Sequence, residues 1–260
     1  MMHENSIEFE VVGDYALFSD PITRVGGEKF SYQIPTYESI KGVTSSIYWK
    51  PTFIWVIDKV RVMNIIQTET RGTRPIRING GNDLSYYTYL KNVRYQVKAH
   101  FIWNENRPEL ECDRNENKHH NIARRMMERG GRRDIFLGTR ECQAYVTPCV
   151  YGEGKGAYDD VPELSFGMML HGITYPDEAY SEETRNMLTV RLWNPVMRHG
   201  EVEFCRQTNF SLPMERVLGE VYGSCIQKHV RPMEMKSFGR EQNNFSGLDE
   251  FEGGGMNVMD

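Results

Sequence analysis

The fold is decided by residues 35–63, PTYESIKGVTSSIYWKPTFIWVIDKVRVM, in which a helical pattern gives way to an extended one at Pro51. The first half opens with Pro-Thr, a favourable helix entry, and carries apolar residues at helix-like intervals until the proline ends the helix. The second half, residues 53–63, is rich in β-branched and aromatic residues, as strands are. A helix that leads directly into a strand is therefore predicted here.

The segments on either side of this stretch extend the pattern. Strand character is found in residues 7–18 (IEFEVVGDYALF), 90–103 (LKNVRYQVKAHFIW) and 141–148 (ECQAYVTP). Residues 118–130 place apolar side chains at helical spacing among arginines, which predicts a short amphipathic helix with a basic outer face. The order strand, helix, strand, strand, helix, strand predicts an α+β fold of the ferredoxin-like, RRM-like kind.

This domain is expected to span residues 1–150, with a protruding basic hairpin or loop between its second and third strands. The hairpin segment, residues 64–89, contains turn-forming glycines and Arg71, Arg74 and Arg77. Residues 151–235 are expected to form a smaller β-rich C-terminal domain, because several strand-like runs follow one another there. Residues 236–260 are rich in Gly, Asn and acidic residues and predict a disordered acidic tail.

Charge is distributed unevenly along the chain. The formal net charge of −5 argues at first sight against a nucleic-acid partner. Between Lys118 and Arg133, however, six basic residues face a single acid, Glu128, whereas residues 153–183 are strongly acidic. RNA is expected to bind the first region and to avoid the second.

Several classes of protein are disfavoured by the sequence. No run approaches the roughly 18 to 20 apolar residues that a membrane span needs, and the start of the chain lacks a signal-peptide pattern, so a cytoplasmic protein without a membrane partner is expected. The five cysteines lack zinc-ligand spacing. We therefore expect no metal and no other cofactor.

The densest group of chemically active residues is Lys118-His119-His120. Histidine can move protons near neutral pH, and lysine is a cation suited to a phosphate. Two other interpretations remain open, namely solvated or helix-capping histidines and a metal site. Tyr48 is expected to approach this group, since the two helices of a ferredoxin-like domain run antiparallel and bring the end of the first beside the start of the second.

A third feature is the run from Gly130 to Asp134, GGRRD. Glycines after a helix can let backbone amides approach a phosphate, and paired arginines can hold phosphates bidentately. The alternative is a glycine helix stop followed by solvated charges.

Six stretches, taken together and in this order, are more specific than any single motif. They are residues 13–20 (GDYALFSD), 35–51 (PTYESIKGVTSSIYWKP), 82–100 (NDLSYYTYLKNVRYQVKAH), 114–119 (RNENKH), 130–143 (GGRRDIFLGTRECQ) and 190–193 (VRLW). In these stretches the chain closely resembles the subtype I-C (Dvulg) branch of the Cas-five family of CRISPR-associated RAMP proteins. The resemblance weakens around Asp159 and beyond about Phe210.

The resemblance implies an endoribonuclease that cuts CRISPR repeat RNA at the base of its hairpin. Such a protein then stays on the 5′ handle of the crRNA and joins the backbone and large subunits of the type I-C Cascade complex, meeting target DNA only through that complex. The branch's catalytic tyrosine, lysine and histidine fall on Tyr48, Lys118 and His119. The candidates for RNA contact are Lys50, Arg71, Arg74, Arg77, Arg125, Gly130, Gly131, Arg132 and Arg133.

RNA carries its own nucleophile, the 2′-hydroxyl, so the chemistry needs alignment, proton transfer and stabilisation of negative charge, without a metal. His119 and Tyr48 are expected to share the general acid and base roles. Lys118 is expected to stabilise the phosphorane and to lower the tyrosine pKa by proximity. The competing functions are a non-catalytic module that binds the 5′ handle and a metal-dependent hydrolase built on His119 and His120.

Overall fold

The computed structural model describes residues 5–20, 28–76, 80–174 and 189–204. The elements in chain order are β1 (Ile7–Ala16), β2 (Lys29–Phe30), α1 (Tyr37–Ile47), β3 (Phe53–Val62), β4 (Thr68–Thr73), β5 (Ser85–Trp103), the 3-10 helix η2 (Pro108–Asp113), α2 (Glu116–Glu128), β6 (Ile135–Phe136), β7 (Gln143–Pro148), β8 (Leu164–Ser165), β9 (Met169–Thr174), β10 (Thr189–Trp193), β11 (Val196–Arg198) and β12 (Glu201–Glu203). The expected tail, residues 236–260, and Arg77 lie outside the described residues.

The central strands lie in the order β7, β1, β5, β3, and each pair of neighbours is antiparallel. This is the order that a split βαβ arrangement produces when the two crossovers are α1 and α2. The α+β, ferredoxin-like fold expected from the sequence is confirmed. The strand in the middle, β5, begins five residues earlier than expected, at Ser85, because its first half pairs with β4.

Local sequence explains where the two helices begin and end. The Thr36 side chain caps α1 by accepting a hydrogen bond from the Ser39 amide, and the Asn115 side chain caps α2 in the same way through the Lys118 amide. Gly130, with φ of 82°, terminates α2 in the left-handed conformation that glycine adopts without strain. Of these caps, Asn115 fixes the start of α2, the helix end that lies in the candidate site.

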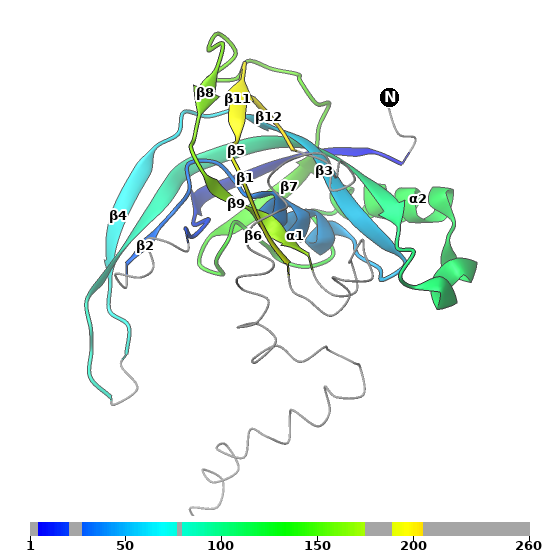
Figure 1. Ribbon diagram of the computed structural model, residues 1–260, viewed down its shortest axis with the longest axis horizontal. Coiled ribbons are helices and arrows are strands. Elements are labelled where there is room, and N and C mark those ends of the chain that lie inside the picture. Colours follow the sequence, from blue (N-terminus) through cyan, green and yellow to red (C-terminus); the bar gives the residue numbers. More distant parts are fainter. Residues whose placement is uncertain (1–4, 21–27, 77–79, 175–188, 205–260) are drawn as a thin grey trace, which may run out of the picture.

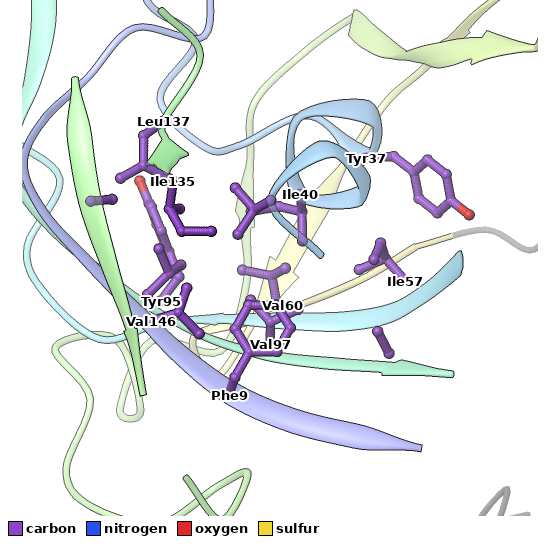
Figure 2. Close-up of a cluster of buried hydrophobic side chains, with 14 of the residues drawn as sticks. Phe9, Tyr37, Ile40, Ile57, Val60, Tyr95, Val97, Ile135, Leu137 and Val146 are labelled. Atoms are coloured by element: carbon purple, nitrogen blue, oxygen red, sulfur yellow. The ribbon is translucent and has the colours of Figure 1, made fainter. Parts of the chain in front are cut away.

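The core lies between the sheet and the helices (Figure 2). Alternate residues of β1, among them Phe9 and Val11, are fully buried on the face toward α1, where Ile40 meets them. Each such side chain stabilises the fold by about 1.5–3 kcal/mol through removal of apolar surface from water. The sheet therefore presents one buried face and one outer face.

A long hairpin of β4 and the first half of β5 extends away from the helices (Figure 1). This confirms the protruding hairpin predicted for residues 64–89. On it, the Arg71 guanidinium bonds the carboxylate of Glu69 at 2.8 Å and stacks over the ring of Tyr15. Lys91 also pairs with Glu69, at 2.7 Å, and these cations hold the pKa of that carboxyl at about 2.

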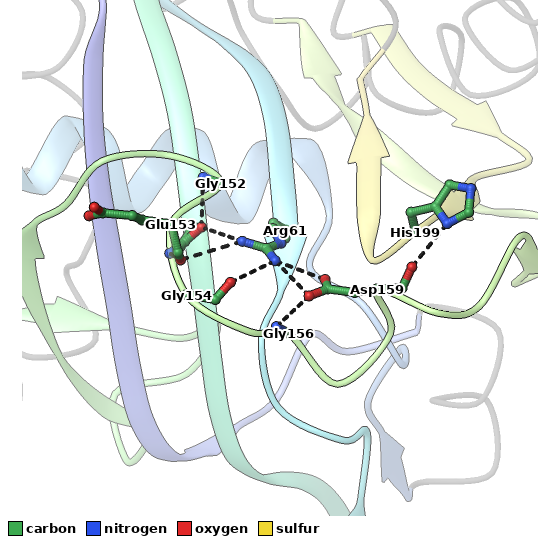
Figure 3. A network of polar contacts seen from close by, with 8 residues as sticks. Arg61, Gly152, Glu153, Gly154, Gly156, Asp159 and His199 are labelled. Atoms are coloured by element: carbon green, nitrogen blue, oxygen red, sulfur yellow. Dashed lines mark hydrogen bonds and ion pairs between the residues drawn. The ribbon is translucent and has the colours of Figure 1, made fainter.

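Residues 152–159 cross the outer face of the sheet, where Arg61 of β3 binds them (Figure 3). The Arg61 guanidinium bonds both carboxylate oxygens of Asp159, at 2.8 and 2.9 Å, and the carbonyl of Gly154 at 3.0 Å. Part of the acidic segment is thus folded against the sheet. Residues 152–159 therefore cover part of the outer face of the sheet.

Beyond this loop, β12 pairs with β3 and is followed by β11 and β8, so these strands continue the same sheet. β9 and β10 form a separate two-stranded sheet. The division into two domains at residue 150 stays a prediction. In the described part of the chain, no helix has both the length and the apolar character to cross a bilayer.

Candidate active site

Tyr48 follows the last residue of α1 and turns away from the helix in extended conformation. Its amide donates to the carbonyl of Thr44 at 3.2 Å, and its carbonyl accepts a hydrogen bond from the Trp55 indole at 2.7 Å. The ring packs against Phe53. Its backbone is thus held on both sides, and its phenol points toward α2.

The phenol meets His119, which α2 projects from its first turn. The Tyr48 hydroxyl lies 2.8 Å from Nδ1 of His119. The other ring nitrogen, Nε2, lies 2.8 Å from the backbone carbonyl oxygen of Asp113. A carbonyl oxygen can only accept a hydrogen bond, so Nε2 must carry a proton. In the neutral tautomer, Nδ1 is then free of hydrogen and accepts the hydrogen bond from the Tyr48 hydroxyl. The structure brings these two predicted residues together, 71 positions apart in sequence.

Lys118 joins the pair through Asp113. Its ammonium lies 2.5 Å from one carboxylate oxygen of Asp113. The other oxygen accepts a hydrogen bond from the Thr52 hydroxyl at 2.9 Å and lies 3.4 Å from Nε2 of His119. The Lys118 side chain is half exposed, so its ammonium binds Asp113 and is also accessible to solvent.

The electrostatics correct one expectation. The pKa of Tyr48 is raised, mainly because the phenol is buried and secondly because the Asp113 carboxylate is near; the cation that opposes this shift is Arg132. Lys118 was expected to lower the pKa of Tyr48, but its ammonium pairs with the Asp113 carboxylate instead. The pKa of Asp113 is correspondingly lowered by its bonds to Lys118 and Thr52.

The glycine loop after α2 has a structural task. The amides of Gly130 and Gly131 donate to the last carbonyls of α2, and those of Arg132 and Arg133 donate to the carbonyls of Ser46 and Ile47 at the end of α1. The four amides expected to approach a phosphate are therefore already engaged. The loop ties the end of α2 to the residues that precede Tyr48.

Basic side chains surround this region. Lys50, Arg125, Arg132 and Arg133 are exposed, and within the described part of the chain none of the four forms an ion pair. Arg74 is exposed on the hairpin, whereas the guanidinium of Arg71 is engaged by Glu69. RNA contact by these residues and by Gly130 and Gly131 stays a prediction.

The two adjacent histidines do not converge. Nε2 of His120 lies 3.1 Å from the carbonyl of Ser6, while both nitrogens of His119 have the partners described above. Among the described residues, no three His, Cys, Asp or Glu side chains are grouped as metal ligands. The geometry gives the alternative of a metal site at His119 and His120 no support.

Sequence reasoning did not single out Asp113 and Thr52. Asp113 lies in the polar run CDRNEN (112–117), six positions before His119. Thr52 directly follows the proline that ends the Tyr48 segment. Both positions lie next to predicted site residues, but no periodic pattern relates them.

The split βαβ sheet with its long hairpin and basic helix defines a RAMP-like fold. Residues 6–205 match the family model described as CRISPR-associated protein (Cas_Cas5), Cas5d. The chain belongs to this family of CRISPR-associated proteins.

Relatives and solved structures agree with this assignment. The chain is 28% identical over 165 residues to the CRISPR pre-crRNA endoribonuclease Cas5d of Mannheimia succiniciproducens, covering 54% of this chain and 71% of the relative. It is 28% identical over 181 residues to the Cas5d of the same description from Thermus thermophilus, covering 66% and 75%. A crystal structure titled as a CRISPR-associated protein is 34% identical, with a TM-score of 0.66, and covers 80% of this chain and 95% of that one. A functionally uncharacterized protein of Streptococcus mutans is 38% identical, with a TM-score of 0.65 and the same coverage.

Proposed function

We propose that this protein is a metal-independent endoribonuclease that cuts CRISPR repeat RNA at the base of its hairpin by attack of a 2′-hydroxyl. It then holds the 5′ handle of the crRNA as a subunit of the type I-C Cascade complex. The names of its relatives, both pre-crRNA endoribonucleases, support the reaction class. The observation that carries the proposal is the 2.8 Å contact between the Tyr48 hydroxyl and Nδ1 of His119, beside Lys118.

The proposed step moves two protons in one direction. As the 2′-oxygen bonds to phosphorus, its proton passes to the Tyr48 oxygen while the phenol proton passes to Nδ1 of His119. Burial raises the pKa of Tyr48, so a free phenolate is unfavourable and the transfer to His119 must accompany the attack. The P–O5′ bond breaks and the 5′ oxygen takes up a proton from solvent, which leaves a 2′,3′-cyclic phosphate and a 5′-hydroxyl. The imidazolium then returns its proton to the Tyr48 oxygen, and the phenol releases its other proton to solvent.

The cations have separate tasks in this scheme. Lys118 stabilises the negative charge of the five-coordinate phosphorus, because Asp113 links its half-exposed ammonium to the Tyr48–His119 pair. The exposed side chains of Lys50, Arg125, Arg132 and Arg133 bind phosphates of the hairpin. Cleavage and binding thus depend on different residues.

One observation favours a second candidate, a non-catalytic subunit that only binds the 5′ handle. Tyr48 is 3% exposed and His119 0% exposed, so RNA must displace side chains to reach the phenol. A protein that never makes this movement would hold RNA without cutting it.

A cleavage assay in EDTA separates the two candidates. The protein is mixed with its own repeat RNA, and with the same RNA carrying deoxyribose at the scissile position. The proposal predicts a single cut in the first and none in the second, with both RNAs bound equally. RNA that is shifted on a native gel but never shortened supports the binding subunit, and a cut that needs added zinc or manganese contradicts metal independence.

A further inference from the structure

Asp113 contacts every group of the proposed mechanism except the phenol itself. One carboxylate oxygen lies 2.5 Å from the Lys118 ammonium, and the other lies 3.4 Å from Nε2 of His119. Its backbone carbonyl lies 2.8 Å from the same Nε2. One residue therefore holds the imidazole from behind with its main chain and the ammonium from the side with its carboxylate.

The surroundings of the imidazole make this contact consequential. The His119 ring is completely buried and is packed by the rings of Phe53, Phe101 and Trp103, none of which can offset a positive charge by ionisation. Among the described residues, the titratable groups in contact with it are Tyr48 and Asp113, and the Lys118 ammonium binds the other oxygen of the Asp113 carboxylate. A proton arriving at Nδ1 creates a buried cation, which is costly unless an anion is close. Asp113 is that anion.

The carboxylate is itself fixed in place. The Thr52 hydroxyl donates to Oδ2 at 2.9 Å, and Thr52 precedes the first residue of β3. The loop is also tied to the sheet because the Arg114 guanidinium donates to the carbonyl of Asn104 at 3.0 Å. Asp113 is thus held between the sheet and α2.

We propose that Asp113 is a positioning residue for RNA cleavage. Its main-chain carbonyl selects the His119 tautomer that can take the Tyr48 proton, and its carboxylate supplies the counter-charge for the imidazolium and places Lys118 beside the reacting pair. Thr52 orients that carboxylate through the hydrogen bond from its hydroxyl. This inference rests on the proposed nuclease function and assigns to it two residues beyond Tyr48, Lys118 and His119.

The test compares three variants of the full chain. Asp113→Asn removes the charge and keeps the shape, Thr52→Val removes only the hydrogen bond that orients the carboxylate, and Glu111→Gln removes an exposed carboxylate from the same 3-10 helix as a control. Single-turnover cleavage is measured in EDTA between pH 5 and 9. Protonation of the His119 ring in the free protein is followed by NMR, with the signal assigned from a His119→Gln sample.

Asp113→Asn is expected to cut about 10²-fold more slowly, the loss typical of a misplaced reacting group. The imidazolium signal of His119 should appear only at lower pH than in the unmodified protein, since its counter-charge is gone. Thr52→Val should slow cleavage by a smaller factor, and Glu111→Gln should change neither readout. A purely structural role for Asp113 would lower the melting temperature without moving the protonation of His119.

The outcomes separate the inference from the function on which it rests. An unmodified protein that does not cut its repeat RNA refutes the nuclease proposal, and the NMR comparison then decides alone whether Asp113 supplies the counter-charge. Equal protonation behaviour of His119 in the Asp113→Asn and unmodified proteins overturns the inference, whatever the cleavage rate. If Asp113→Asn does not fold, unslowed cleavage by Thr52→Val overturns it.

Discussion

Replacement of Tyr48 with phenylalanine removes one oxygen atom and keeps the ring that packs on Phe53. It deletes the donor that faces Nδ1 of His119 at 2.8 Å, in a position that is almost fully buried. The variant therefore separates the proton-transfer role of the phenol from its contribution to the core.

Two magnitudes follow from this geometry. A buried acceptor left without a partner costs about 1–3 kcal/mol of folding stability. For a chain of this size, each kcal/mol lowers the melting temperature by about 2–4 °C, and a thermal melt of the variant measures this loss. Loss of a positioned proton-transfer group slows cleavage by about 10²- to 10⁴-fold, or about 3–5 kcal/mol of barrier. RNA affinity should stay the same, because the buried phenol offers almost no surface to the hairpin.

The assay is single-turnover cleavage of the repeat RNA with protein in excess, combined with filter binding of an RNA that carries deoxyribose at the cut site. Tyr48→Phe, His119→Gln and the double variant form a cycle. If the two residues act as one relay, the double variant is about as slow as the slower single variant. Cleavage by Tyr48→Phe at the unmodified rate, or additive losses in the cycle, would refute this reasoning.

Three further predictions concern binding and stability. Arg132→Ala should weaken RNA binding and flatten the slope of log affinity against log salt by about 0.7 to 1, while Lys155→Ala in the acidic loop should leave it unchanged in the same titration. Gly131→Ala should lower the melting temperature, because φ at this residue is 112° and the added Cβ would lie 3.1 Å from the carbonyl of Arg133 and 3.2 Å from Ile135. Gly42→Ala should raise the melting temperature, because Gly42 lies within α1 and its added Cβ would meet no atom within 4 Å. The Arg61 guanidinium holds the pKa of Asp159 below its usual 3.8, so this pair stabilises the fold above that pH and the contribution is lost as pH falls through the lowered value. Asp159→Asn should therefore lose less stability than the unmodified protein when thermal unfolding is compared at pH 6 and pH 2.5, and equal losses would contradict the assignment.

The parts of the fold that follow from periodicity could be read from the sequence. Residues 53–63 and 90–103 are apolar enough to be strands wherever they lie, and antiparallel helices then bring Tyr48 toward α2. That is why the approach of Tyr48 to Lys118, at the start of α2, could be anticipated without coordinates; the structure places Tyr48 against the adjacent His119. The start of β5 could not, because residues 85–89 become a strand only by pairing with β4.

The electrostatics of the site were not accessible in this way. Lys118 was expected to act on Tyr48, but its ammonium binds the carboxylate of Asp113, five positions earlier. Sequence spacing alone could not show this contact. The use of the Arg132 and Arg133 amides was equally hidden, because these amides donate to the end of α1, an element that is distant in sequence. Both facts depend on loop geometry, which has no sequence period.

The chemical state of the two RNA ends tests the central claim most directly. In the proposed mechanism Tyr48 and His119 relay the proton of the RNA's own 2′-hydroxyl, so the upstream product should end in a 2′,3′-cyclic phosphate and the downstream product should begin with a 5′-hydroxyl. Mass spectrometry of both fragments decides the matter. A 3′-hydroxyl and a 5′-phosphate would mean that water attacked the phosphorus, and would contradict the mechanism built on this site.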